Sequence, residues 1–220
     1  MTNVTQTHQE QSNMKVLIFG ATGATGRDVM KLALDLGYAV TAFVRNRAKV
    51  DLDHPALTVV QGDVMDLTSV ERAVPGHDAV LCSLGDGMTG KVRSTGTQNI
   101  IRAMQKTGVR RLICQSTIGA GDSQGNLNFY WKYVMFGILL RRALADTHLQ
   151  EQYIRQSRLD WTIVRPGSLT DSGRTGTYRH GFPNNDKTTA LKISTADVAD
   201  FMLKQLIDDT YLHATPGLSY

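Results

Sequence analysis

A glycine-rich loop near the N-terminus constrains this chain more than any other feature. The apolar run over Lys15–Phe19 is typical of a strand buried on both faces, and residues 25–36 carry apolar side chains at helical spacing. Between them stands GATGATG, with Gly20, Gly23 and Gly26 at every third position. Glycines there let the backbone turn sharply, let the helix pack close to the sheet, and open the helix N-terminus to an anion. The loop therefore predicts a ligand that carries a pyrophosphate.

Strand and helix patterns alternate along the rest of the chain. Apolar runs predict strands at 38–44, 57–60, 77–84, 109–114, 160–164 and 188–193. Helical periodicity predicts helices at 66–74, 94–107, in a long stretch up to about 157, and at 195–207. This alternation predicts an α/β fold, a doubly wound parallel sheet with helices on both faces. We expect one domain over residues 14–220, after a polar, disordered tail at 1–13.

Composition excludes several classes of protein. Lysine and arginine exceed acidic residues by only 24 to 20, without a polybasic block, so nucleic acid is not predicted as a partner. The most apolar window, 129–140, contains Lys132 and is shorter than the roughly 20 residues of a membrane span. It reads as a core or interface helix. Cys82 and Cys114 lie in apolar runs, as buried free thiols do. We expect a cytoplasmic protein without a membrane partner, either a monomer or a homodimer.

Basic residues at the end of the second predicted strand indicate which dinucleotide binds. Arg45 stands at the strand tip, Arg47 and Lys49 follow, and no acidic residue occurs before Asp51. An acidic side chain at this place accepts the ribose 2′-hydroxyl of NAD, whereas a guanidinium pairs with the 2′-phosphate of NADP. The sequence favours NADP(H). A solvated basic loop is the alternative reading.

Several segments together carry a family resemblance. They are IFGATGATG, FVRNRAK, QGDVMD, AVLCSLG, ICQSTIGAG and LDWTIVRPGSLTD, spread over residues 15–207. With them the chain resembles the atypical short-chain dehydrogenases/reductases, close to the NmrA-like group and to the biliverdin reductase B (flavin reductase) family. The resemblance implies a Rossmann fold that binds NADP(H).

The resemblance also implies roles for individual residues. Ser116 falls at the active-site serine, Asp63 and Val64 fall at the adenine-contacting turn, and Cys114 lies where the nicotinamide rests. The full set of implied cofactor positions is Gly20, Thr22, Gly23, Ala24, Thr25, Gly26, Arg45, Lys49, Asp63, Val64, Leu84, Gly85, Cys114, Pro166 and Ser168.

One motif of short-chain dehydrogenases is missing. A tyrosine followed four residues later by lysine protonates the carbonyl oxygen in enzymes that act on ketones. Here Tyr130, Tyr133 and Tyr153 are followed four residues on by Val, Gly and Ser. A sugar-nucleotide or ketone dehydrogenase is therefore disfavoured. The resemblance implies instead hydride transfer to a planar, conjugated acceptor, a flavin, bilin or quinone, with the proton taken from solvent. Ser168 replaces a histidine that the bilin-reducing relatives carry, which weakens the prediction for bilins.

Other features leave alternatives open. A non-catalytic NADP(H) sensor would present the basic aromatic segment 130–142 to a partner. The aromatic side chains at 129–136 would stack on an acceptor or, as is commoner, pack in a core or interface.

His148 and His180 read as surface residues rather than as proton donors. No set of His, Cys, Asp or Glu has metal-ligand spacing, so no metal site is predicted.

Overall fold

A central sheet organises the chain. The computed structural model describes residues 14–85 and 90–220. Eight strands lie in the order β3-β2-β1-β4-β5-β6-β10-β8, all parallel except that β8 runs antiparallel to β10. Their bounds are β1 Lys15–Phe19, β2 Ala39–Val44, β3 Leu57–Gln61, β4 Ala79–Cys82, β5 Arg111–Gln115, β6 Asp160–Pro166, β8 Arg179–His180 and β10 Gly217–Ser219. The order 3-2-1-4-5-6 of the first six strands is that of a Rossmann fold, so the predicted fold class is confirmed.

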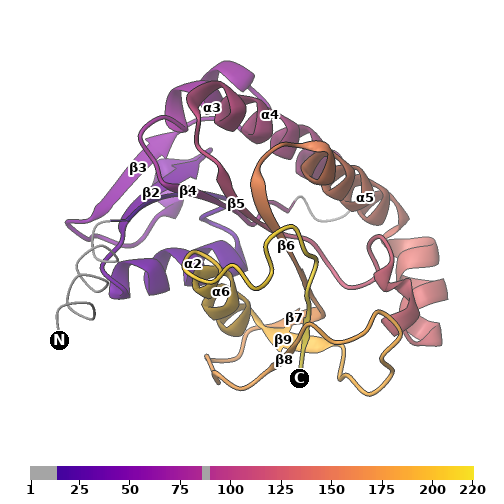
Figure 1. Ribbon diagram of the computed structural model, residues 1–220. Helices are drawn as coiled ribbons and strands as arrows, with labels where there is room; N and C mark the ends of the chain where they lie inside the picture. The colour runs from indigo at the N-terminus through magenta and orange to yellow at the C-terminus, as the bar shows by residue number, and fades with distance from the viewer. Residues whose placement is uncertain (1–13, 86–89) are drawn as a thin grey trace.

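Helices cover both faces of this sheet (Figure 1). On one face α2 (Ala24–Asp35) packs against α6 (Thr195–Lys204). On the other face α4 (Val92–Thr107) lies between α3 (Leu67–Ala73) and α5 (Arg141–Gln156). Strands β1 and β4 sit between these layers, and four of the five β1 residues and all four of β4 are buried. Burial on both faces explains why these strands read as unbroken apolar runs.

The region after β5 differs most from the sequence-based expectation. The predicted long helix is interrupted: a 3-10 turn η2 (Ser123–Asn126) precedes the π-helix η3 (Tyr130–Leu139), and α5 starts separately at Arg141. In η3 the hydrogen bonds reach five residues back, as from Leu140 N–H to Met135 O at 2.7 Å. Leu140 itself has φ −107° and ψ 15°, outside the helical range, and this separates the two helices.

The C-terminal third was also predicted imperfectly. The expected strand at 188–193 is confirmed only at its end, because β9 covers Lys192–Ser194 and pairs with β7 (Ser168–Thr170) outside the main sheet. Thr188 is held instead by a turn in which Asp186 accepts from its N–H and hydroxyl, and Leu191 has φ +52°. Helix α6 ends at Lys204, three residues earlier than predicted. Strands β8 and β10 were not predicted. No helix in the described part of the chain is long and apolar enough to cross a membrane.

Candidate functional site

Two adjoining cavities lie at the carboxyl ends of the parallel strands. The larger one, the cofactor cavity, has a volume of about 420 Å³ and is bordered by the ends of β1 to β4. The smaller one, the acceptor cavity, has a volume of about 260 Å³ and is bordered by the end of β6 and by η3. Arg93, Gln115 and Leu169 line both. In open α/β sheets, ligands bind outside the carboxyl ends of the strands, where both cavities stand.

The glycine loop forms the floor of the cofactor cavity. Gly20 has φ +82°, and a Cβ there would lie 2.6 Å from the Ser83 carbonyl oxygen. Helix α2 starts after Gly23, and no described side chain caps its first N–H groups or places an acidic charge in its first turn. N–H groups at a helix N-terminus that no side chain caps are available to bind an anion. A pyrophosphate therefore fits this floor.

Gly26 acts by packing rather than by contact with the cavity. A Cβ on Gly26 would collide with the Gly20 carbonyl, a backbone group that cannot move aside cheaply. We expect Gly26→Ala to cost roughly 1–3 kcal/mol of unfolding free energy and to weaken NADP(H) binding, because the loop must open to admit the methyl group. Urea unfolding and cofactor titration measure both effects. Gly173→Ala, where a Cβ meets nothing within 4 Å, is the control; equal losses in both variants would contradict the packing role.

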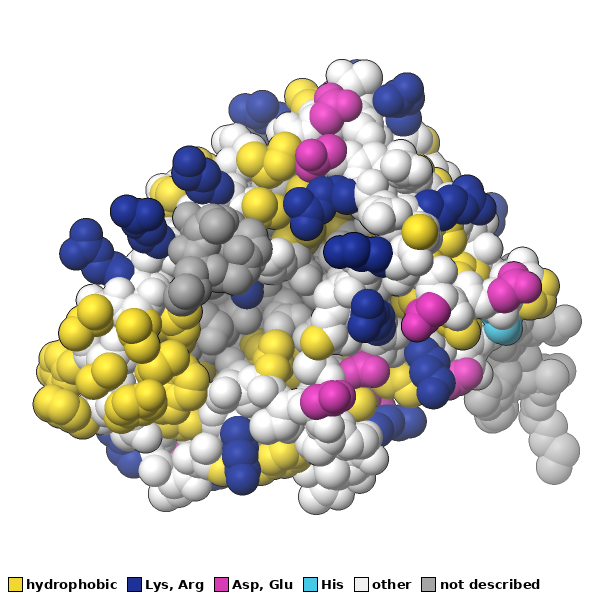
Figure 2. Space-filling model, turned by 180° about the vertical axis from the view of Figure 1, so that it is seen from behind, with side chains coloured by type: hydrophobic (Ala, Val, Ile, Leu, Met, Phe, Trp, Pro, Cys, Tyr) yellow, Lys and Arg dark blue, Asp and Glu magenta, His cyan; other side chains and the backbone are white. Residues whose placement is uncertain are grey.

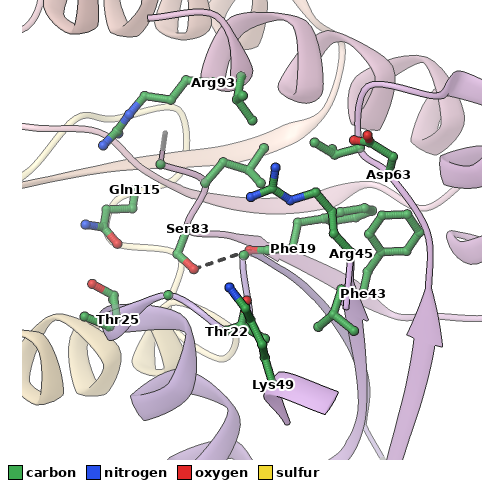
Figure 3. Close-up of a pocket in the computed structure, with 18 of the residues that line it drawn as sticks. Phe19, Thr22, Thr25, Phe43, Arg45, Lys49, Asp63, Ser83, Arg93 and Gln115 are labelled. Carbon is green, nitrogen blue, oxygen red and sulfur yellow. Dashed lines mark hydrogen bonds between the residues drawn. The ribbon is translucent and has the colours of Figure 1, made fainter. Parts of the chain in front are cut away.

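Basic side chains reach over the other end of the cofactor cavity. Arg45, directly after β2, and Lys49, in the 3-10 turn η1 (Arg47–Lys49), both point into it (Figure 3). Arg47 does not line the cavity and donates instead to the Val59 carbonyl at 3.4 Å. Asp63 borders the same end and accepts from the Met65 N–H at 3.0 Å, so its carboxylate is fixed in a turn. The side chains of Arg45 and Lys49 suit the phosphate of a phosphorylated adenosine, and the oriented carboxylate of Asp63 suits its polar adenosine part.

Two polar atoms at the junction of the cavities have no partner. Arg93 Nη1 and Gln115 Oε1 are both buried without a hydrogen bond to any described residue. Arg93 comes from the first turn of α4 and Gln115 from the end of β5, and Figure 3 shows the two side chains facing the same space. Buried polar groups in folded proteins are nearly always paired, so these atoms point to a ligand with both a donor and an acceptor. A carboxamide such as that of nicotinamide has both.

The acceptor cavity is mainly apolar. Its wall comes from the loop after β5, from η3, from α5 and from the end of β6, and its residues are Arg93, Gln115, Ser116, Thr117, Ile118, Leu127, Trp131, Phe136, Leu140, Ala143, Leu144, Thr147, Pro166, Gly167, Ser168, Leu169 and Leu191. None of these described residues is an Asp, Glu, His, Cys, Tyr or Lys. An apolar slot with a few polar groups at one end is typical of a small-molecule site.

Ser116 is tied to a buried ion pair. Its hydroxyl donates to Glu151 Oε1 at 2.6 Å, and Glu151 accepts two hydrogen bonds from Arg165, at 2.9 and 2.7 Å. Arg165 is fully buried and donates also to Asp122 at 2.6 Å. Burial alone would raise the pKa of Glu151, but the hydrogen bonds and charge of Arg165 outweigh it and lower that pKa. Glu151 is therefore a carboxylate at neutral pH, and the single proton of Ser116 is committed to it.

The structure places most of the predicted residues at the two cavities. Gly20, Thr22, Gly23, Ala24, Thr25, Arg45, Lys49, Asp63, Val64, Leu84 and Gly85 line the cofactor cavity. Ser116, Pro166 and Ser168 line the acceptor cavity. Gly26 lines neither. Cys114 was predicted at the nicotinamide, but its side chain has no exposed surface, packs in the core under α4 and α5, and accepts from Gln150 Nε2 at 3.2 Å. The neighbouring Gln115 reaches the cavity instead, because successive side chains of a strand point to opposite faces.

The remaining titratable candidates lie elsewhere. His180 lies on β8 with Nδ1 2.8 Å from the Tyr211 hydroxyl, and neither it nor His148 lines a cavity. The described residues contain no group of three or more His, Cys, Asp or Glu able to hold a metal ion. Arg93, Gln115 and the Glu151–Arg165 pair were not predicted from the sequence. For the pair one signal existed: Arg165 ends the buried run of β6, where an unpaired charge would be costly.

Comparisons with known proteins agree with this geometry. Residues 20–209 match the sequence pattern of a family described as NAD(P)H-binding. An uncharacterized chloroplastic protein of Arabidopsis thaliana, At2g34460, is 36% identical over 176 residues, which are 74% of this chain and 61% of that protein. The chain thus spans less than two thirds of this relative's length.

Two solved structures share the whole architecture. The oxidoreductase ylbE from Lactococcus lactis is 26% identical with a TM-score of 0.80, over 94% of this chain and 90% of that one. The protein ChuY of Escherichia coli O157:H7, described as an anaerobilin reductase, is 25% identical with a TM-score of 0.79, over 94% and 97% of the two chains.

Proposed function

Because the chain belongs to the NAD(P)H-binding family, we propose that it is an NADPH-dependent reductase that passes hydride to a small, planar, conjugated acceptor of the flavin, bilin or quinone type. The observation that carries this proposal is the pair of adjoining cavities, one shaped for a dinucleotide and one apolar, which meet at Arg93 and Gln115. The oxidoreductase ylbE and the anaerobilin reductase ChuY, both structural neighbours, support the reaction class.

The protein contributes mainly orientation. The glycine loop and the N-terminus of α2 hold the pyrophosphate, Arg45 and Lys49 hold the phosphorylated ribose, and Arg93 with Gln115 holds the carboxamide. When bound, the nicotinamide supplies the hydride. The apolar wall of the second cavity keeps water from the reacting faces and sets the acceptor against the nicotinamide ring, which makes the transfer effectively unimolecular.

Ser116 positions a ligand and does not act as an acid. Its proton is held by the Glu151 carboxylate, so toward the cavity its oxygen offers only lone pairs. It accepts from an N–H group of the acceptor, which flavins and bilins carry. No described residue of the acceptor cavity is an ordinary proton donor near neutral pH, and the proton that follows the hydride comes from water.

The proposal is tested by following NADPH oxidation at the nicotinamide absorbance with FMN, riboflavin, a small quinone and biliverdin, and with NADH as the comparison cofactor. We expect oxidation that depends on an acceptor and prefers NADPH. Saturable NADPH binding without oxidation by any of these acceptors would overturn the reductase and favour the non-catalytic NADP(H) sensor.

Ser116→Ala gives a sharper result within the same assay. Loss of one neutral hydrogen bond to the ligand should lower kcat by about 2- to 12-fold. Because the cofactor cavity does not include Ser116, the Kd for NADPH should stay unchanged. Ser157→Ala is the control, since Ser157 directly follows α5 and its hydroxyl bonds the Ile154 carbonyl and the Leu159 N–H, away from both cavities. An unchanged kcat in Ser116→Ala would remove Ser116 from the mechanism.

A further inference from the structure

The π-helix η3 presents large apolar side chains to solvent. Phe129 is 76% and Ile138 72% exposed, and Tyr130, Tyr133 and Leu139 are each more than half exposed. We call these five residues the η3 patch. Figure 2 shows hydrophobic side chains gathered at the end of the molecule that carries η3. Scattered apolar residues on a surface need no explanation, but a contiguous patch marks an interaction site.

The inner side of η3 is apolar as well. Trp131 and Phe136 pack against Ile118, Leu127 and Leu191, and they form part of the acceptor-cavity wall. A surface helix that packs one face on a core normally turns a polar face to water. In η3 the outer face is apolar as well, apart from Lys132, so folding of the described chain does not account for it.

The charged residues of the segment that carries the patch are all basic. Lys132 lies within η3, Arg141 and Arg142 follow it, and all three are exposed. The sequence from 123 to 145 contains no Asp or Glu. Exposed aromatic and aliphatic side chains together with lysine and arginine are the composition by which segments lie on a bilayer of anionic lipids, with rings at the headgroup level and cations on the phosphates.

A second copy of the chain fits the patch less well. A twofold dimer centred on the patch would bring the same residues of both copies together. Lys132, Arg141 and Arg142 would then meet their own equivalents, with no acidic residue of the segment to pair with them. Like charges brought together in this way are destabilising.

We propose that the η3 patch docks on the surface of an anionic lipid bilayer. The apolar window at 129–140 is too short to span a bilayer, and no membrane partner was predicted for that reason, but peripheral docking requires no span. Trp131 and Phe136 of the same helix line the acceptor cavity, so docking would hold this cavity next to the lipid headgroups. On the basis of the proposed function, a long-tailed quinone dissolved in the bilayer would then reach the cavity without crossing water.

Vesicle co-sedimentation of the full chain tests the docking without any need for turnover. We expect binding to mixed phosphatidylglycerol and phosphatidylcholine vesicles, and little to pure phosphatidylcholine. Phe129→Ser/Ile138→Ser and Arg141→Ser/Arg142→Ser should each reduce binding by about tenfold or more. The matched controls are Ile207→Ser, at a side chain 56% exposed just after α6, and Arg102→Ser/Arg158→Ser, at exposed arginines in α4 and just after α5. Unchanged unfolding temperatures show that the variants fold.

Several results would overturn the docking. These are absence of binding to phosphatidylglycerol vesicles, equal binding to both kinds of vesicle, equal losses in the control variants, or a solution dimer that Phe129→Ser/Ile138→Ser converts to monomers. A separate arm compares reduction of a long-tailed quinone in vesicles with that of a short, soluble quinone. Docking predicts that Phe129→Ser/Ile138→Ser slows only the first reaction. If neither quinone is reduced by any variant, the proposed function fails for quinones while the sedimentation result still decides the docking.

Discussion

Replacing Arg45 by alanine should weaken NADPH binding by roughly 10- to 150-fold and leave NADH binding nearly unchanged. Arg45 projects from the end of β2 into the cofactor cavity, at the place where the 2′-phosphate of NADP lies in a Rossmann fold. A guanidinium makes strong charge-assisted hydrogen bonds to a phosphate. NADH carries a neutral 2′-hydroxyl in place of that phosphate, so it lacks this interaction. Titration of each dinucleotide against nicotinamide or protein fluorescence gives both Kd values.

Arg47→Ala is the matched control for Arg45. Arg47 has the same charge, lies two residues on, and donates to the Val59 carbonyl outside the cavity. Arg47→Ala should shift the Kd of NADPH only slightly, because it removes one positive charge near the cavity without removing a contact to the phosphate. Equal losses for NADPH and NADH in Arg45→Ala, or equal losses in the two variants, would show that Arg45 does not read the phosphate.

The cofactor side of the site was largely predictable from the sequence, for a physical reason. Buried parallel strands appear as continuous apolar runs, and the residues that follow them fall at one edge of the sheet. Locating β1, β2 and β4 therefore locates Gly20, Arg45 and Leu84 around one cavity. The prediction for Cys114 was wrong by one residue. Neighbouring side chains of a strand point to opposite faces, so Gln115 faces the cavity while Cys114 faces the core.

The acceptor side was not predictable in the same way. Its wall combines η3, the start of α5 and Leu191, which local patterns do not bring together. Its width depends on how η3 turns and on the break at Leu140, and both are set by packing. Strands β8 and β10 have two and three residues, which is too short for a recognisable strand pattern in the sequence. They form by pairing, β10 with β6 and β8 with β10. The pairing of Glu151 with Arg165 likewise joins a helix to a strand.

That pairing should dominate the stability of the region around the site. Removal of one partner from a buried ion pair leaves the other charge without compensation, and Arg165→Met should lower the unfolding free energy by about 3–5 kcal/mol. For a chain of this size that is a fall in Tm of roughly 6–20 °C. Glu151→Leu/Arg165→Met removes both charges and should recover part of the loss. Arg110→Ala removes the exposed partner of Asp160, at 2.8 Å, and is expected to change little because solvent screens that pair.

The loss in Arg165→Met should also depend on pH, with a definite sign. The folded pKa of Glu151 is lowered, so its ionised form stabilises the fold fully above the ordinary glutamate pKa of about 4.3, and the contribution disappears as the pH falls through the lowered value. The lowered pKa of Asp122, which also binds Arg165, acts in the same direction. Thermal unfolding of wild type and variant should therefore differ most at neutral pH and converge in acid. A difference independent of pH, or a double variant no more stable than the single one, would mean that packing volume rather than charge governs this site.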